Sequence, residues 1–95
     1  MAEHRYWQMV TWRGAAGDSP VLLFAEIDSG WEVRKVDVFD DGRLARADAH
    51  HEEGSTVLGS AAVPPITAID DMPDFSAIEI TREAFEEIWL AAAKD

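Results

Sequence analysis

The dipeptide Asp41-Gly42 constrains the fold more than any other feature, because it stands between two stretches with strand-like alternation, residues 31–40 and 43–49. Asp-Gly in this setting is typical of a type I′ β-hairpin with a two-residue loop. Across such a loop, three of the four facing pairs carry opposite charges and the fourth is apolar. The pairs are Asp40 with Arg43, Phe39 with Leu44, Asp37 with Arg46, and Lys35 with Asp48. Each pair of this kind contributes roughly 0.2–1 kcal/mol, so we predict this register.

The predicted register also sorts the side chains of the hairpin onto two faces, and a slip of one residue would exchange them. One face is small and apolar, with Val36, Val38, Ala45, Ala47 and Ala49. The other face carries Trp31, Phe39 and Leu44 among charged residues. An uncovered apolar patch usually marks an interface, so we predict that Trp31, Phe39 and Leu44 bind a partner.

A helix is predicted at residues 81–94, which contain no glycine or proline. Thr81 is suited to cap its N-terminus, and Glu83 and Lys94 suit the two ends of its dipole. Phe85, Ile88, Trp89 and Ala92 recur at the spacing of one apolar helical face. We expect Phe85 and Trp89 to pack on the alanine face of the hairpin.

Two further strands are predicted at residues 5–13 and 21–28, where aromatic and β-branched side chains are frequent. Residues 50–77 form a long loop with three prolines, and residues 78–80 a short extra strand. The 95 residues suit one domain. We therefore predict an α+β fold: an antiparallel meander sheet of about four strands, possibly with a short fifth, and one C-terminal helix packed on one face. Glu26, Glu32 and Arg34 interrupt apolar strands, so we expect a partly buried ion pair that fixes the register.

Three stretches resemble a known family. They are Pro20-Val21-Leu22-Leu23-Phe24-Ala25-Glu26-Ile27-Asp28, then Trp31-Glu32-Val33-Arg34-Lys35-Val36, then Glu79-Ile80-Thr81-Arg82-Glu83-Ala84-Phe85-Glu86-Glu87-Ile88-Trp89. With Phe39, Asp41-Gly42-Arg43 and Pro64-Pro65, they are similar to a bacterial family of small acidic proteins known only as domain of unknown function 6881. The resemblance runs from about Tyr6 to Trp89. It implies a bacterial protein of a single domain. Because no activity is established for that family, the resemblance assigns no catalytic or binding role to any residue.

The charge balance narrows the classes of partner. Nineteen acidic and eight basic residues give a formal net charge of −11, which argues against direct contact with nucleic acid phosphates. No apolar run approaches the ~20 residues that span a bilayer. Because the first residues lack the basic and apolar regions of a signal peptide, we expect a cytoplasmic protein with no membrane contact. The absence of cysteine excludes disulfides and zinc–thiolate sites.

No catalytic, cofactor or metal site is predicted. In His50-His51-Glu52-Glu53, adjacent side chains of an extended chain point in opposite directions, so they do not converge on one ion. Asp37 to Asp48 partly imitates a calcium loop, but its third position is Phe39 and its twelfth is not glutamate. No serine lies in a nucleophile elbow.

The last third of the chain is strongly acidic, and either it is a solvated face or it docks a basic partner. We predict docking through Asp70, Asp71, Asp74, Glu83, Glu86 and Glu87. The expected function is a non-catalytic protein-binding module, most concretely an immunity protein or antitoxin that neutralises a basic partner such as a toxin nuclease. One alternative is a small enzyme or ligand-binding domain at the 50–77 loop that uses His50 or His51. Another is an accessory protein that buries Trp31 and Phe39 against a second copy of itself, as a homodimer.

Overall fold

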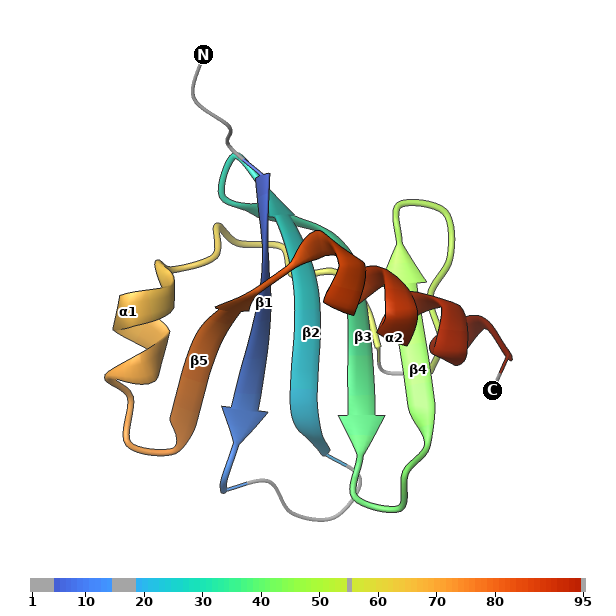
Figure 1. The fold of residues 1–95 in the computed structure, drawn as a ribbon, viewed down its shortest axis with the longest axis horizontal. Coiled ribbons are helices and arrows are strands. Elements are labelled where there is room, and N and C mark those ends of the chain that lie inside the picture. The colour runs from blue at the N-terminus through green and yellow to red at the C-terminus, as the bar shows by residue number, and fades with distance from the viewer. Residues whose placement is uncertain (1–4, 15–18, 55, 95) are drawn as a thin grey trace.

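The fold is a five-stranded antiparallel sheet with one helix on one side and a long loop and a short helix on the other (Figure 1). The computed structural model describes residues 5–14, 19–54 and 56–94. The strands are β1 (Arg5–Trp12), β2 (Pro20–Asp28), β3 (Trp31–Phe39), β4 (Leu44–Asp48) and β5 (Phe75–Ile80). The helices are α1 (Ile66–Asp70) and α2 (Arg82–Lys94). The predicted α+β class is confirmed.

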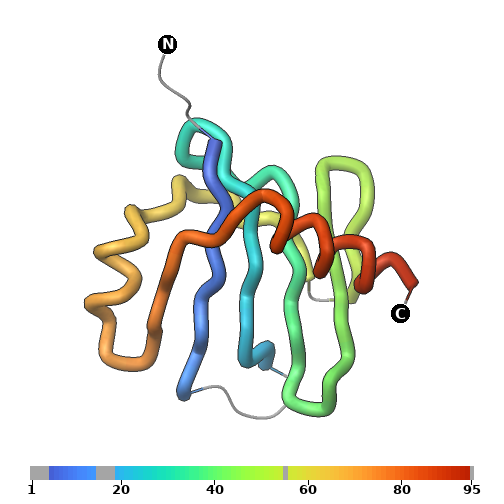
Figure 2. The backbone as a smooth tube through the Cα atoms, viewed as in Figure 1, coloured from blue at the N-terminus to red at the C-terminus, as the bar shows by residue number. Residues whose placement is uncertain are grey.

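The strand order is β4-β3-β2-β1-β5, so the first four strands form the predicted meander. The chain then leaves β4, passes behind the sheet and returns at the far edge, where β5 pairs with β1 (Figure 2). β5 begins at Phe75, earlier than the predicted strand at residues 78–80, and α1 also lies within the predicted loop. The predicted loop therefore both covers one face of the sheet and supplies an edge strand.

The turn between β3 and β4 corrects the predicted register by one residue. Phe39 N donates to Arg43 O and Gly42 N donates to Phe39 O, both at 2.9 Å, which closes a three-residue loop at positions 40–42. Only Gly42 in this loop has positive φ, at 88°. A type I′ turn would also require positive φ at Asp41, which is costly outside glycine. The paired positive φ values of a type I′ turn occur instead at Ser29 and Gly30, between β2 and β3.

The corrected register reverses the face of each β4 side chain. Val38 pairs with Leu44, Asp37 with Ala45, and Val36 with Arg46. We call the side of the sheet that carries α2 the α2 face, and the other side the loop face. The α2 face carries Trp7, Met9, Leu22, Phe24, Glu26, Arg34, Val36, Val38, Leu44, Arg46 and Ile78. The loop face carries Gln8, Val10, Leu23, Ala25, Lys35, Asp37, Phe39, Ala45, Ala47 and Ala77.

α2 begins and ends close to the predicted bounds, but it packs on a partly different set of side chains. Ala84 N donates to Thr81 Oγ1 at 3.1 Å, which confirms the N-cap. Phe85 is fully buried and stacks with Trp89, the ring centroids lying 6.1 Å apart. Of the face predicted to receive these rings, Val36 and Val38 do lie on the α2 side, but Ala45 and Ala47 face the opposite side of the sheet. The guanidinium groups of two arginines, described below, occupy that place.

The loop face carries the apolar cluster of the fold. Val10 of β1, Ala77 of β5 and Ile69 of α1 are buried together. Partly buried side chains pack against them from the sheet and from the covering segment; they are Leu23, Val63, Ile66 and Phe75. The segment between β4 and β5 therefore serves as the second layer of the domain.

Candidate functional site

Arg34 ties α2 to the sheet. Its Nε donates to Oε1 of the buried Glu26 at 2.5 Å, and its two terminal nitrogens donate to Glu86 at 3.1 and 2.6 Å. The bidentate contact with Arg34 lowers the pKa of Glu86, and hydrogen bonding to Glu86 is the largest cause that raises the pKa of Arg34. Arg5 adds a second contact to Glu26 at 3.2 Å. Glu86, one of the predicted docking residues, is thus engaged within the fold.

The rings of α2 lie over these cations. The Arg34 guanidinium carbon is 4.9 Å from the centroid of Phe85 and 5.0 Å from that of Trp89. Arg46 lies 4.7 Å from the Trp89 centroid. Cation–π contacts of this kind strengthen when they are shielded from water. The expected partly buried ion pair is confirmed for Glu26 and Arg34.

Glu32 has a different role from the one expected. A bulge separates the pair Glu26–Arg34 from the pair Ile27–Glu32, so Glu32 faces the covering segment. Its Oε1 accepts a hydrogen bond from Gly59 N at 2.7 Å. Glu32 therefore fixes the covering segment to the loop face.

Trp31, Phe39 and Leu44 do not form the predicted apolar patch. Phe39 is buried, with the Arg43 guanidinium 4.3 Å above its ring. Leu44 lies on the opposite side of the sheet, beside Val38. Trp31 is 49% exposed at the start of β3. The predicted face is wrong for two reasons: the three-residue loop turns Leu44 to the other side, and the bulge between Glu32 and Arg34 breaks the alternation between Trp31 and Phe39. The three side chains lie in three separate surroundings.

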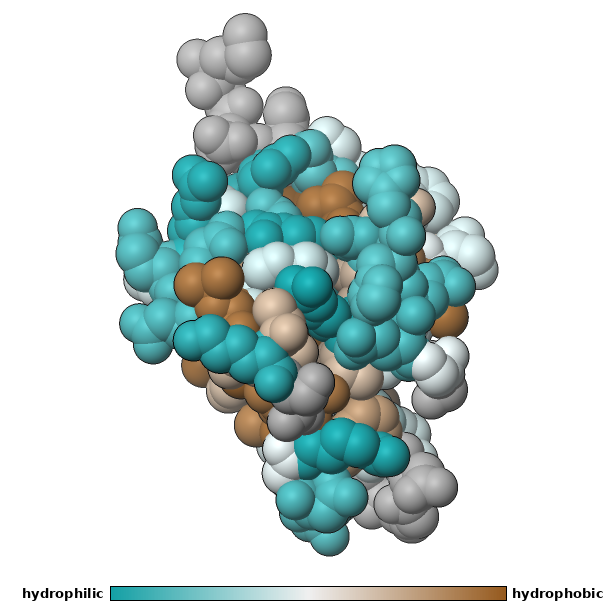
Figure 3. Space-filling view, turned by 90° about the vertical axis from the view of Figure 1, so that its right-hand side faces the viewer, coloured by the Kyte–Doolittle hydropathy of each residue, from teal (hydrophilic) through white to brown (hydrophobic). Residues whose placement is uncertain are grey.

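A different apolar surface does lie open. α2 crosses the sheet at an angle and leaves the end near the β3–β4 turn uncovered on the α2 face (Figure 1). We call the apolar side chains of this part the open strip: Met9, Leu22, Phe24, Val38, Leu44 and Ile78. Ile78 is 53% exposed, and the other five are partly buried. In Figure 3, seen from the β4 edge, hydrophobic residues gather at the lower left, on the side of the sheet that carries α2.

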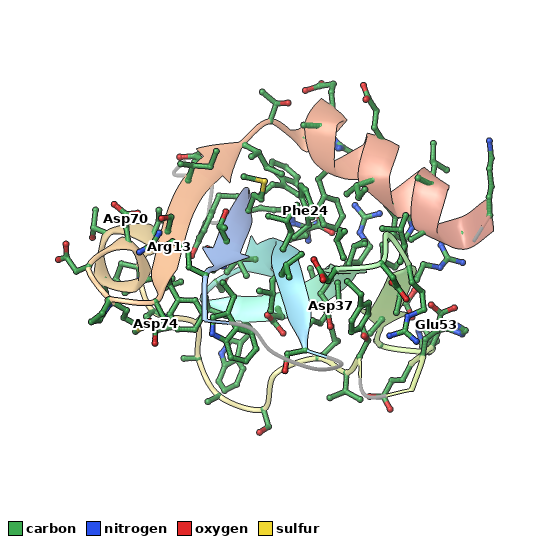
Figure 4. The ribbon with its side chains drawn as sticks, turned by 90° about the horizontal axis from the view of Figure 1, so that it is seen from below. Arg13, Phe24, Asp37, Glu53, Asp70 and Asp74 are labelled. Atoms are coloured by element: carbon green, nitrogen blue, oxygen red, sulfur yellow. The ribbon has the colours of Figure 1, made fainter. Side chains whose placement is uncertain are left out.

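Carboxylates cluster at the corner made by α1 and β5 (Figure 4). Asp70, Asp71 and Asp74 are all exposed there. Asp70 also accepts a hydrogen bond from Ala77 N at 3.0 Å, so it holds α1 against β5. On α2, Glu83 and Glu87 are exposed. Asp71, Asp74, Glu83 and Glu87 form no ion pair within the described residues.

Most of the cations, by contrast, contact other groups of the chain. Ion pairs hold Arg5, Arg34, Lys35 and Arg82. Arg43 and Arg46 lie over aromatic rings. Arg13 donates to the carbonyl oxygens of Pro73 and Phe75 at 2.8 and 3.2 Å, and to Ser76 Oγ. The outward field is therefore set by the carboxylates.

His50 and His51 lie in the turn after β4, and both are exposed. His51 Nε2 is 2.9 Å from Glu53 Oε2, and this contact lowers the pKa of Glu53. Among the described residues, no three histidine or carboxylate side chains come together as metal ligands. Asp37 and Asp48 of the calcium-like spacing lie on opposite faces of the sheet.

A family model described as "Domain of unknown function (DUF6881)" matches residues 5–94. The chain belongs to the DUF6881 family. No curated protein and no solved structure matches it. In the described part of this DUF6881 domain, no helix is long and apolar enough to cross a membrane.

Two polar residues of the DUF6881 domain were not predicted as site residues but line the same pocket on the loop face. They are Gln8 and Lys35. Gln8 shares its side of the strand with Tyr6 and Val10, which is a signal that its side chain points into a covered face. Lys35 gives no such signal, because its neighbour Arg34 is also charged. The proximity of Gln8 and Lys35 depends on the strand order, since Ala25 of β2 separates them.

Proposed function

We propose that this protein is a non-catalytic protein-binding module whose partner is a basic protein. The most concrete form is an immunity protein or antitoxin in the cytoplasm that neutralises a basic toxin such as a nuclease. The observation that supports this proposal is the open strip, an apolar part of a sheet face on a domain of net charge −11. An apolar centre within a polar rim is the usual anatomy of a protein interface.

The open strip offers side chains that suit the centre of such an interface. Phe24 and Met9 are neighbours across β1 and β2, and aromatic residues and methionine are enriched at interface cores. Ile78 continues this row on β5. A partner that inserts an apolar side chain here would bury the part of the α2 face that α2 leaves open.

The exposed carboxylates favour a basic partner over a second copy of this chain. Two copies that each carry −11 repel one another, whereas a basic surface is attracted and steered. In a nuclease cleft built to hold phosphates, aspartate and glutamate side chains take the place of the phosphate charges. Asp71, Asp74, Glu83 and Glu87 supply charge that no ion pair with another described residue offsets.

Paired capture experiments test the docking surface. The tagged protein and its Ile78→Asp variant are used to capture partners from nuclease-treated native lysate at low salt. Leu90→Asp serves as the matched control, because Leu90 is 60% exposed but lies on the outer side of α2. We expect one stoichiometric basic protein with the wild type and with Leu90→Asp, and its loss with Ile78→Asp. Capture that Ile78→Asp leaves unchanged would remove the open strip from the interface.

The charge part of the proposal is tested with the purified partner. We expect the association rate constant to fall at least tenfold between low and high salt, as electrostatic steering requires. An association rate constant that does not change with salt would contradict electrostatic steering. Light scattering at several protein concentrations separates the remaining outcome, in which a second copy covers the strip.

A further inference from the structure

A pocket of about 330 Å³ lies on the loop face, between the sheet and the covering segment at residues 59–64. Ala25 of β2 forms its floor, and the small side chain leaves room above the strand. Gln8 of β1 and Lys35 of β3 flank Ala25 in one row across the sheet. The remaining walls are mostly apolar: Val10, Leu23, Val63, Ile69, Met72 and Phe75. Small-molecule sites are typically concave and apolar with a few convergent polar groups.

Gln8 is the residue that marks this pocket as a site. Its side chain is on the pocket wall and only 4% exposed. No donor among the described residues reaches its Oε1 atom. A buried carbonyl oxygen without a partner costs about 1–3 kcal/mol, and most such groups in proteins are satisfied. Oε1 itself has almost no accessible surface, so a ligand N–H or O–H reaches it once the terminal amide of Gln8 turns toward the pocket. That contact would recover this loss.

Lys35 supplies donors at the other side of the floor. Its side chain is largely buried, and its ammonium nitrogen lies 3.7 Å from Asp37 Oδ1, which is longer than a hydrogen bond. The neighbouring carboxylates of Asp37 and Glu32 offset the charge of Lys35, so the local field does not favour an anion. Gln8 and Lys35 are two strand spacings apart, or roughly 10 Å between their backbones.

The covering segment is fixed on both sides of the pocket. Gly59 N donates to Glu32 Oε1, and Val63 N donates to Gly30 O, both at 2.7 Å. The pocket is thus part of the folded framework and does not need a ligand to shape it. It also lies on the opposite side of the sheet from the open strip, so it is independent of the proposed docking surface.

The geometry points to a binding site for a neutral, mainly apolar small molecule on the loop face. This ligand donates a hydrogen bond to Gln8 Oε1 at one end and accepts one from Lys35 Nζ at the other. Its apolar body rests on Ala25, under the covering segment.

Titration of the ¹⁵N-labelled full chain with indole-3-acetamide, followed by amide NMR shifts, tests this site. The probe is neutral and aromatic and carries both a ring N–H donor and a carbonyl acceptor. Indole-3-acetate is the matched probe, since it has the same size and a negative charge. We expect saturable shifts at Ala25, Lys35 and residues 60–63, with the acetate at least tenfold weaker. Absence of saturable shifts, shifts confined to other regions, or equal affinity for the two probes would overturn the inference.

Variants assign the binding to the row on the sheet. Gln8→Leu keeps the side-chain size and removes the acceptor, so we expect a three- to tenfold loss of affinity. Truncation at the pocket edge by Met72→Ala should also weaken binding, and it provides the test should Gln8→Leu fail to fold. The control is His50→Ala with His51→Ala, which lies outside the pocket and should leave affinity unchanged. Undiminished affinity in a folded Gln8→Leu variant, or a loss in the histidine control, would refute the assignment.

Discussion

On the α2 face, the buried Phe85 and the ion pairs of Arg34 hold the helix to the strands, whereas on the loop face the second layer is held by Val10, Ile69 and Ala77. The first arrangement places charges where water is largely excluded and depends on every partner being present. The second arrangement is apolar and tolerates a pocket among its side chains. A helix that packs through one buried ring and one ionic anchor can therefore leave part of a sheet face uncovered. A covering loop is held at several points along its length, and on the loop face it encloses a pocket against the sheet.

The largest effect is expected from breaking the ionic anchor. Arg34→Met keeps most of the side-chain length but leaves Glu26 buried without its main partner, so we expect a loss of about 3–5 kcal/mol in the free energy of unfolding. Urea unfolding followed by tryptophan fluorescence measures it. Arg82→Met is the control, because Arg82 is exposed and its contact with Glu86 is 3.9 Å. Equal losses for the two variants would show that the anchor does not hold α2.

The next effect concerns the apolar layer. Ile69→Ala removes a buried side chain from the cluster on the loop face, and we expect a loss of roughly 2–3 kcal/mol. Ile78→Ala, on the open strip, should cost less than about 1 kcal/mol because Ile78 is half exposed. The same unfolding measurement compares them. If Ile78→Ala were as damaging as Ile69→Ala, the strip would be packed and not open.

A smaller effect should appear in acid on the α2 face. The pKa of Glu86 is lowered in the fold by Arg34, so its contribution to stability is fully present above the unfolded value of about 4.3 and is lost as the pH falls through the lowered value. We expect Glu86→Gln to be less stable than the wild type at pH 7 and to lose less stability on acidification. Urea unfolding between pH 7 and pH 3 measures both slopes. Parallel pH profiles would contradict the role of Glu86.

The loop face should respond to pH with the opposite sign. Burial raises the pKa of Asp37 above its ordinary value, although Lys35 and a hydrogen bond from Thr56 act against the rise. The folded state therefore holds this proton more tightly, and stability falls as the pH rises from the unfolded value of about 3.9 through the raised value. We expect the stability of Asp37→Asn relative to the wild type to increase over that range. A difference that stays constant with pH would show that Asp37 does not titrate as described.

Much of the fold was predictable because strand and helix patterns are local. The pattern that indicates each element lies within a few residues of sequence. This holds for the helix cap at Thr81, the apolar stripe with Phe85 and Trp89, and the alternation in the strands. The register of β3 and β4 was not, since Asp41-Gly42 suits both a two-residue and a three-residue loop. Charge pairs at the surface were a weak guide, because each contributes too little to outweigh the strain of positive φ at Asp41. The wrong register placed Leu44 on the wrong face of the sheet, beside Phe39 in the predicted patch.

The candidate sites were less accessible to sequence reasoning, because they depend on which strands become neighbours. Gln8 and Lys35 are 27 positions apart and meet only through Ala25. The open strip needs both the corrected register and the angle at which α2 crosses the sheet. The predicted acidic residues are exposed except for Glu86, whose pairing with Arg34 joins segments far apart in the chain.

The pairing of β5 with β1 has a kinetic consequence. Trp7 lies opposite Ile80, so this edge closes only after Ile80 has been made, whereas the three hairpins before it join near neighbours. Contacts of such high sequence separation slow folding. α2 follows β5 directly, and the covering segment precedes it. Ile78 of the open strip and Phe75 of the pocket both belong to β5, so a growing chain on the ribosome completes neither surface until β5 docks.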